Sequence, residues 1–384
     1  MTNKDGEMRV LRTRRSFLKA TGAAGSLVWA GCTTTGSNRK HHADIYPSYT
    51  DAKTGAKVYN LTPRDAQDVI VYQTHPMWAP HMEYLVFTSG GLVHALEMAT
   101  GRIRPILDTP TDFSMQWNSG NLYYFQGRDL FRLDIPSAFM GTGKAEKVAA
   151  LPAGYPHAQG GLSVDATGNV VYTGTVLETD KRWGVAGFSP DGWRTLTAVN
   201  FKVGHIQANP YVRDTVMFCW ETGGDAPQRT WFIDGKDDMA RPVYEETNNE
   251  WVTHEAWWGR NRVVFTIWPY DDAHERLPHG VAYTDLRTGK LNILAQYPAW
   301  HTQASSDGRW ALGDDFERNI WLIKVSTKER RLLTQGHLGE NCKTHPHASF
   351  TPDSRAIVLN SSRSGNGDIL LVPLPEWDSL PKLQ

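Results

Sequence analysis

The chain has 384 residues, of which 11% are aromatic and 21% charged, with 34 glycines and 21 prolines. This composition favours a packed β-rich fold and excludes extended disorder. The first 32 residues carry six basic and two acidic side chains, so the remaining 34 basic and 39 acidic residues give a net charge of −5 and exclude the basic surface of a nucleic-acid-binding protein.

Residues 1–32 are predicted to be an export signal rather than part of the fold. The stretch Thr13-Arg14-Arg15-Ser16-Phe17-Leu18-Lys19 matches a twin-arginine signal, and the apolar run over residues 20–30 is too short to span a bilayer. Cys32 follows a small-residue pair as in a lipoprotein cleavage site, which predicts a lipid anchor at Cys32. We therefore expect a periplasmic or envelope-anchored protein in which residues 33–45 form a polar tether.

Segments with a common pattern recur along the chain at intervals of roughly 40 to 50 residues, the period of four-stranded propeller blades. Each segment opens with a short strand, continues through a turn and returns in a second strand. The seven starting points lie near His75, Phe113, Gln159, His205, His254, His301 and His345. The sequence therefore predicts an all-β fold, a seven-bladed β-propeller over residues 46–377, followed by a C-terminal tail over residues 378–384.

Turn sequences and the two ends of the repeat array support this fold. The turns at residues 189–192, 306–308 and 351–353 are predicted to join the first and second strands of their blades, because Pro presets φ and Asp and Gly favour a tight return. The last blade ends near Pro373 without a fourth strand, whereas residues 56–63 read as a strand without partners. We expect this N-terminal strand to complete the last blade and close the ring, so that no long edge stays unpaired.

Five histidines stand at the start of predicted first strands: His205, His254, His301, His345 and His347. Because the first strands of all blades begin around one mouth of the axial channel, these side chains are expected to converge. Residues i and i+2 share one face of a strand, so His345 and His347 can point at one ion together with His301. Three imidazoles suit Mn, Zn, Fe or Ni better than Ca or Mg. A single histidine in this place, such as His205 after Gly204, also fits a hydrogen-bonded structural residue.

Several of these motifs resemble the oligogalacturonate lyases, which are seven-bladed propellers of the polysaccharide lyase group. The resemblance is carried by Thr-His-Pro-His-Ala-Ser-Phe-Thr-Pro at residues 344–352, by Thr253-His254-Glu255, by His301 with Ser-Asp-Gly at residues 306–308, and more weakly by Gly204-His205 and by Phe-Cys-Trp-Glu at residues 218–221. It covers the chain from residue 200 to the end well and the first half only in outline.

The resemblance implies a carbon–oxygen lyase that cleaves a uronate oligosaccharide, oligogalacturonate in the first place, by β-elimination. A base removes the C5 proton of the sugar while a divalent metal, Mn²⁺ in the first place, binds its carboxylate. Carried over by position, His301, His345 and His347 would hold the metal. His254 would be the base, with His205 as a second catalytic histidine.

Two positions depart from the family pattern. Cys342 stands where the family has a glutamine ligand, and a thiolate there would favour a softer metal. Asn209 stands before Pro210 where the family has an arginine. The ion pair with the substrate carboxylate is therefore either lost or formed by another cation. Gln207 and Asn209 are the residues of this segment expected to contact the substrate.

Two further readings stay open. The Asn209 replacement leaves room for a propeller lyase that acts on another uronate, such as ulvan. The same replacements also suit a decayed active site, and thus a non-catalytic propeller of the TolB-like sort that binds a protein or glycan in the cell envelope.

Aromatic residues near the mouth, among them Trp268 and Trp300, can stack on sugars, but most of them are expected in the core.

Overall fold

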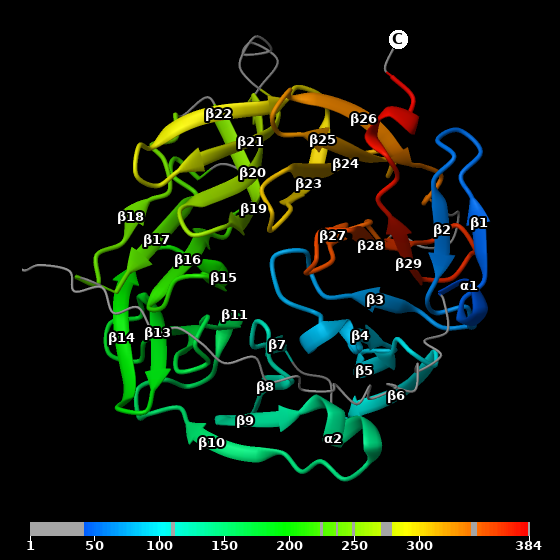
Figure 1. The fold of residues 1–384 in the computed structure, drawn as a ribbon. Coiled ribbons are helices and arrows are strands. Elements are labelled where there is room, and N and C mark those ends of the chain that lie inside the picture. Colours follow the sequence, from blue (N-terminus) through cyan, green and yellow to red (C-terminus); the bar gives the residue numbers. More distant parts are fainter. Residues whose placement is uncertain are drawn as a thin grey trace, which may run out of the picture. The chain divides into compact units, whose positions relative to one another are not determined.

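Seven antiparallel sheets stand around a common axis, each with its first strand innermost (Figure 1). The computed structural model of the protein describes residues 42–108, 112–222, 226–235, 237–247, 250–269, 279–338 and 344–382. All of these residues belong to one compact unit, Lys40–Gln384. The predicted all-β, seven-bladed propeller is thereby confirmed.

The first four sheets have four strands each. The first sheet comprises β3 (Asp68–Ile70), β4 (Tyr84–Ser89), β5 (Leu92–Glu97) and β6 (Arg102–Leu107). The second comprises β7 (Phe113–Met115), β8 (Asn121–Gln126), β9 (Asp129–Asp134) and β10 (Glu146–Ala150). The third comprises β11 (Gln159–Val164), β12 (Val171–Val176), β13 (Trp183–Ser189) and β14 (Gly192–Val199). The fourth comprises β15 (Val203–Ala208), β16 (Thr215–Trp220), β17 (Thr230–Asp234) and β18 (Arg241–Pro242).

The last three sheets continue the ring and close it. The fifth comprises β19 (Glu250–Trp258), β20 (Arg262–Pro269), β21 (Gly280–Asp285) and β22 (Lys290–Ala295). The sixth comprises β23 (Ala299–Ala304), β24 (Trp310–Asp315), β25 (Ile320–Lys324) and β26 (Glu329–Thr334). The seventh comprises β27 (Ser349–Phe350), β28 (Ala356–Ser361) and β29 (Asp368–Pro373), to which the N-terminal strands β2 (Lys57–Asn60) and β1 (Ser48–Thr50) are added.

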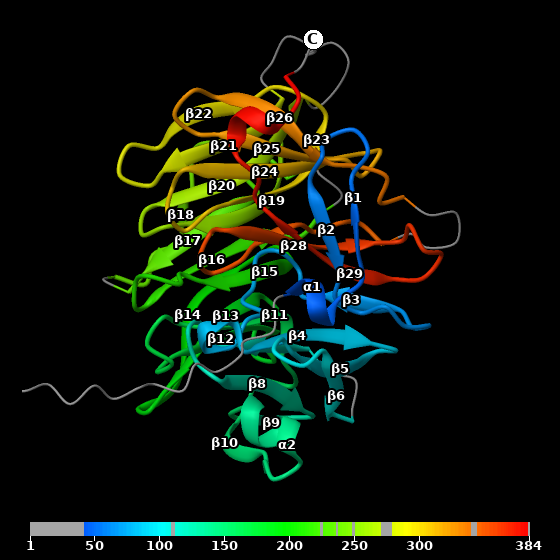
Figure 2. The same ribbon diagram turned by 45° about the vertical axis from the view of Figure 1, so that its right-hand side comes forward.

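Closure of the ring occurs in the seventh sheet, as predicted. β2 pairs with β29 through Tyr59 opposite Leu371 and Asn60 opposite Leu370, and Figure 2 shows β2 beside β29 at the outer side of this sheet. β1 adds a fifth strand that the sequence analysis did not anticipate. Pairing between the two ends of the chain removes the open edge that β29 would otherwise present.

The core lies between neighbouring sheets rather than on one side of each sheet. Within β28, Ile357 and Leu359 pack in a cluster with Leu322 of the sixth sheet. Val358, which points to the opposite face, packs in a cluster with Phe87 of the first sheet. Because both faces of such a strand are covered, all six residues of β28 are buried and apolar residues do not alternate with polar ones.

Short helices fill the connections. They are α1 (His42–Ile45), α2 (Ile135–Met140) and the 3₁₀ turns Pro80–Met82 and Trp377–Ser379. α2 begins where the Asp134 carboxylate accepts a hydrogen bond from the Ser137 amide, and it ends at Gly141 with φ of 78°. Within the described part of the chain, no helix has the length and apolar character needed to cross a membrane.

The structure differs from the sequence-based assignment at four places. His345 and His347 precede β27 instead of standing on it, and His347 has φ of 44°, so strand alternation is not what brings their rings together. The first sheet begins at Asp68 rather than near His75, which lies in the loop between β3 and β4. The turn at residues 189–192 joins β13 to β14, the third and fourth strands, because the same turn chemistry serves any tight hairpin. Leu380, within the expected tail, is buried, and its carbonyl accepts a hydrogen bond from Arg331.

Candidate active site

The inner strands carry β-bulges where the histidines stand. The register shifts between Gly204 and Gln207 in β15, between Thr253 and Ala256 in β19 and between Ala299 and Thr302 in β23. His205 and His254 have φ of 49° and 55°, a left-handed conformation that residues other than glycine rarely adopt. A bulge turns a side chain out of the regular alternation, so the backbone of these strands places the histidine rings.

His301, His345 and His347 come together although two different sheets supply them. The His301 ring centroid lies 4.4 Å from that of His347 and 5.2 Å from that of His345, and the centroids of His345 and His347 are 6.2 Å apart. Burial and the neighbouring His301 lower the pKa of His345 below its ordinary value, and the same two causes together with His345 lower the pKa of His347 to about 2. Possible ligand atoms of His301, Asp314 and His345 all lie within 4.8 Å of one another, and the His347 ring stands beside them. Imidazole nitrogens gathered in this way suit a transition-metal cation.

Asp314 on β24 fixes the orientation of His301. Its carboxylate accepts hydrogen bonds from the His301 amide at 2.6 Å and from His301 Nδ1 at 2.9 Å. Both side chains are buried. Since Nδ1 is occupied, Nε2 is the nitrogen of His301 that can ligate a metal. A carboxylate hydrogen-bonded to the other nitrogen of a ligating histidine is common in metal sites.

Asn360 on β28 holds the His-Pro-His loop in place. Its side-chain amide donates to the His345 carbonyl, while its own backbone amide donates to the Pro346 carbonyl. The Ile70 amide donates to its side-chain oxygen, which ties the loop to the first sheet. His345 Nδ1 is buried and has no hydrogen-bond partner among the described residues. A buried nitrogen without a hydrogen-bond partner, beside two other imidazoles, is suited to ligate a metal ion.

His254 faces the histidine group from the adjacent sheet. Its ring centroid lies 4.2 Å from that of His301, and its Nδ1 is hydrogen-bonded to Tyr72 Oη at 2.6 Å. His254 Nε2 is buried and has no partner within the described residues. Burial and the nearby His301 and His205 hold the pKa of His254 well below its ordinary value. The ring is therefore neutral with one free nitrogen, as a general base requires.

Tyr72, in the loop after β3, stands at the centre of the cluster. Its ring centroid lies 4.8 Å from that of His347, 5.7 Å from that of His205 and 6.0 Å from that of His301. Burial raises the pKa of Tyr72 far above its ordinary value, so the phenol is neutral. No repeat position marks this residue in the sequence.

His205 belongs to a charged network beside this cluster. Its Nδ1 lies 3.0 Å from Glu255 Oε1 and its Nε2 lies 3.6 Å from Glu221 Oε2. Burial alone would lower the pKa of His205, but the Glu255 carboxylate outweighs it and raises the pKa. Glu255 is fully buried, and although burial would raise its pKa, His205 and Arg229 lower that pKa to about 2.

Arg229 is the cation of this network. Its Nε lies 3.7 Å from Glu255 Oε2, its Nη2 lies 4.0 Å from Glu221 Oε2, and its Nη1 donates to the Trp220 carbonyl. The side chain is only 5% exposed, and the Nε atom has no hydrogen-bond partner among the described residues. Arg229 therefore supplies a buried guanidinium in the network of His205, at the end of β15 opposite to Asn209.

Gln207 and Asn209 have side chains that are used within the fold. Gln207 Nε2 donates to the Glu255 carbonyl, which ties β15 to β19. The Asn209 amide donates to the Arg260 carbonyl, and its oxygen accepts from two backbone amides in the following turn. These contacts give no support to a role in substrate binding, which stays a prediction for both residues. Cys342, the fourth candidate ligand, and Cys32 lie outside the described residues.

The Cys219 thiol donates to Glu221 Oε2 over 3.4 Å, and His205, Cys219 and Glu221 bring possible ligand atoms within 4.8 Å of one another. Burial raises the pKa of Cys219 well above its ordinary value. Because Arg229 already balances the negative charge of the Glu221 carboxylate, we interpret His205, Cys219 and Glu221 as part of the charged network and not as a second metal centre.

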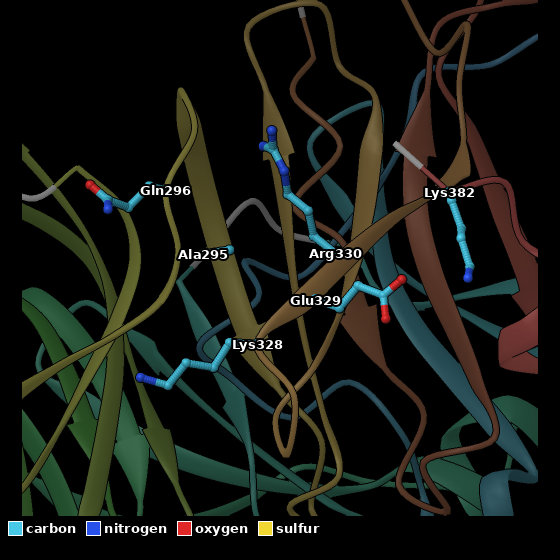
Figure 3. Close-up of a pocket in the computed structure, with 6 residues that line it drawn as sticks. All are labelled: Ala295, Gln296, Lys328, Glu329, Arg330 and Lys382. Atoms are coloured by element: carbon cyan, nitrogen blue, oxygen red, sulfur yellow. The ribbon is translucent and has the colours of Figure 1, made fainter. Parts of the chain in front are cut away.

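A surface pocket of about 380 Å³ lies at the outer rim, far along the sheets from the inner strands. It is lined by Ala295, Gln296, Lys328, Glu329, Arg330 and Lys382. Figure 3 shows that the side chains of Lys328 and Lys382 point in different directions and do not converge on one spot. The pocket offers no group suited to the chemistry of the histidine cluster.

No protein-family model matches the chain. Two curated relatives do, an oligogalacturonide lyase of Pectobacterium atrosepticum and an oligogalacturonate lyase of Dickeya dadantii, each 24% identical over 205 residues. The match covers 47% of this chain, and the chain spans about half the length of these relatives, 52%.

Two solved structures share the fold. An oligogalacturonate lyase in complex with manganese has a TM-score of 0.73 at 21% identity, covering 86% of this chain and 96% of that one. An oligogalacturonate lyase from Vibrio parahaemolyticus has a TM-score of 0.75 at 16% identity, covering 86% of this chain and 97% of that one. The resemblance that the histidine motifs predicted is therefore confirmed in sequence and in fold.

Proposed function

We propose that this chain is a metal-dependent lyase that cleaves uronate oligosaccharides, with oligogalacturonate as the first candidate substrate, by β-elimination. The observation that carries the proposal is the convergence of His301, His345 and His347 directly beside His254, whose Nε2 is free. The names of the similar proteins support the same reaction, and one of them is in complex with manganese.

The residues present fit a divalent transition metal. Three imidazoles stand together, His301 is oriented by a carboxylate, and His345 Nδ1 is buried without a partner among the described residues. We assign His301, His345 and His347 as the ligands, with Mn²⁺ as the first candidate. When bound, the metal would neutralise the substrate carboxylate and stabilise the negative charge that develops next to C5.

His254 acts as the base in this proposal. If its Nδ1–H donates to Tyr72 Oη, the lone pair of Nε2 is available to take the C5 proton. The electron pair of the C5–H bond then forms the C4–C5 double bond, and the bond between C4 and the glycosidic oxygen breaks. The hydrogen bond with Tyr72 orients the His254 ring, and the tautomer with its proton on Nδ1 is the one in which Nε2 can accept the C5 proton.

His205 and Arg229 complete the site. Glu255 beside His205 favours the imidazolium form, which can donate a proton to the departing glycosidic oxygen. Arg229, whose Nε lies 3.7 Å from Glu255 Oε2, offsets the negative charge of Glu255 beside His205 and gives this side of the site a positive charge that suits a uronate. The elimination is then balanced, because one proton leaves C5 and one reaches the oxygen.

Ultraviolet absorbance of the unsaturated product tests the reaction. The protein with Mn²⁺ and digalacturonate should show a steady rise, and His254→Ala should abolish it while retaining bound metal. His94→Ala is a matched control, since His94 lies on β5, the third strand of the first sheet, outside the cluster, and should leave the rate unchanged. No rise with digalacturonate and with a panel of other uronate oligomers, at full metal occupancy, would refute the proposal.

We also propose that the chain is exported by the twin-arginine route and anchored through Cys32. The support is the sequence of residues 13–19 and the position of Cys32, both of which lie outside the described residues. Labelling with a radioactive fatty acid in cells tests the anchor, and Cys32→Ser should remove the label.

A further inference from the structure

We infer that Trp300 and Phe316 form a sugar-binding subsite beside His254, which stacks against the uronate residue joined to the one that loses its C5 proton. The inference rests on the proposed function and adds a binding site for a second pyranose ring. Sugar rings present C–H faces that pack on aromatic rings, and this is the chemistry that the site offers.

The aromatic residues occupy the same rim of the ring as the histidines. Ala299, at the start of β23, pairs with Asp315 at the end of β24. Trp300 comes directly after Ala299 and Phe316 directly after Asp315, so both lie at this rim. In the fifth sheet, Trp251 pairs with Trp268 in the corresponding place. The junction of the fifth and sixth sheets therefore gathers four aromatic residues at the mouth where His254 and His301 stand.

The rings form a row that leads outward from the base. The Trp300 ring centroid lies 4.7 Å from that of His254, and the Phe316 centroid lies 5.2 Å from that of Trp300. Trp251 and Trp268 support this row from the fifth sheet, at 5.8 Å from Trp300 and 5.5 Å from Phe316. A ligand held at His254 thus continues directly onto an aromatic surface.

Phe316 is not a core residue. Its side chain is 55% exposed, one of few large apolar side chains to be so among the described residues. Among the described residues, the indole N–H of Trp300 has no hydrogen-bond partner. Trp268, in contrast, donates its N–H to the Ala299 carbonyl and is fixed in the fold.

The turn that carries Phe316 is held without help from the phenyl ring. The Asp315 carboxylate accepts hydrogen bonds from the amides of Glu317 and Asn319 and from the Trp321 indole. Hydrogen bonds therefore fix the turn, and the exposed part of the phenyl ring is not needed to hold it. Preorganised aromatic surface of this kind binds with little loss of conformational entropy.

Affinity for one and for two sugar residues tests the subsite. In a His254→Gln background with Mn²⁺ bound, calorimetric titration should give tighter binding of digalacturonate than of galacturonate. Phe316→Ala should remove about fivefold to tenfold of that difference, as expected for the loss of one stacking contact. Phe316→Leu, which keeps an apolar side chain but no ring, should remove most of it, whereas Met140→Ala on α2, 57% exposed, should change nothing.

The outcomes separate the subsite from the reaction. If the wild-type protein cleaves digalacturonate and Phe316→Ala leaves the difference between the two ligands unchanged, the subsite is wrong and the lyase stands. Equal loss in Phe316→Ala and Met140→Ala would also overturn the subsite. If neither cleavage nor binding of any uronate is found, the proposed function fails and the subsite fails with it.

Discussion

Asp314 determines how His301 can bind a metal. Because its carboxylate accepts hydrogen bonds from both the amide and Nδ1 of His301, the ring has one orientation and one free nitrogen. Asp314→Asn should weaken Mn²⁺ binding by about 10-fold to 100-fold, the range seen when such supporting carboxylates are lost. Competition with a metal-binding dye measures this. Asp353→Asn, in the turn after β27, should bind metal like the wild type, and equal affinity in both variants would contradict the assignment.

Tyr72 is predicted to act on catalysis through His254. Tyr72→Phe keeps the ring within the cluster but removes the hydrogen bond to Nδ1, so the orientation and tautomer of His254 are no longer held by Tyr72. We expect kcat to fall about tenfold, the equivalent of one hydrogen bond, with little change in KM. The pH dependence of kcat should also shift, because the hydrogen bond affects the basicity of His254. A fall in stability with unchanged kcat and an unchanged pH profile would assign Tyr72 a structural role only.

His337 makes stability depend on pH independently of the metal. It is fully buried between Thr334 and Ser361, and burial lowers its pKa to about 4. The unfolded chain binds a proton below about pH 6.5, whereas the folded chain does so only near pH 4. This residue should therefore cost no stability above pH 7 and about 2 kcal/mol at pH 5, since the unfolded state gains the proton first.

Urea unfolding of the metal-saturated protein at pH 7.5 and pH 5 checks this expectation. His337→Gln, which retains a polar group for the neighbouring hydroxyls, should lose less stability than the wild type over the same pH interval. An identical loss in both proteins would show that other groups cause the pH dependence.

At the scale of elements, the joint between β2 and β29 holds the ring closed. Leu61, directly after β2, is 1% exposed, and its amide donates to the Ile369 carbonyl. Leu61→Ala should lower the free energy of unfolding by about 2 to 5 kcal/mol, because the cavity opens where the seventh and first sheets meet. Lys57→Ala, on the exposed side of β2, should stay within about 0.5 kcal/mol of the wild type. Urea unfolding measures both, and equal stability of the two variants would contradict the role of this joint.

Most elements could be predicted from the sequence because one pattern recurs seven times. The inner strands near Phe113, Gln159, His205, His254 and His301 lie where the repeats place them. The first sheet was misplaced because β3 has only three residues and no histidine at its start. The bulges could not be predicted, since histidine does not by itself indicate the positive φ that His205 and His254 adopt.

At the scale of the whole molecule, the site draws on residues from five sheets or their connections. The histidines were found because each stands near the start of a repeat, although only His205, His254 and His301 lie in first strands and His345 and His347 lie in the loop before β27. Tyr72, Arg229 and Asp314 were missed because they reach the cluster from a loop, from the approach to β17 and from a second strand. Only the closed ring brings such positions together, so their proximity to the histidines can be seen in the structure but not in the sequence.

The proposed reaction requires a bound metal ion, and titration of the metal-free protein with Mn²⁺ measures this requirement. Protein stripped with a chelator and supplied with digalacturonate should form no unsaturated product, and stepwise addition of Mn²⁺ should restore product formation until one ion is bound per chain. The His345→Ala/His347→Ala variant should bind no stoichiometric ion and stay inactive throughout. Product formation at the full rate in the stripped protein, or bound Mn²⁺ in the double variant, would contradict a metal centre at His301, His345 and His347.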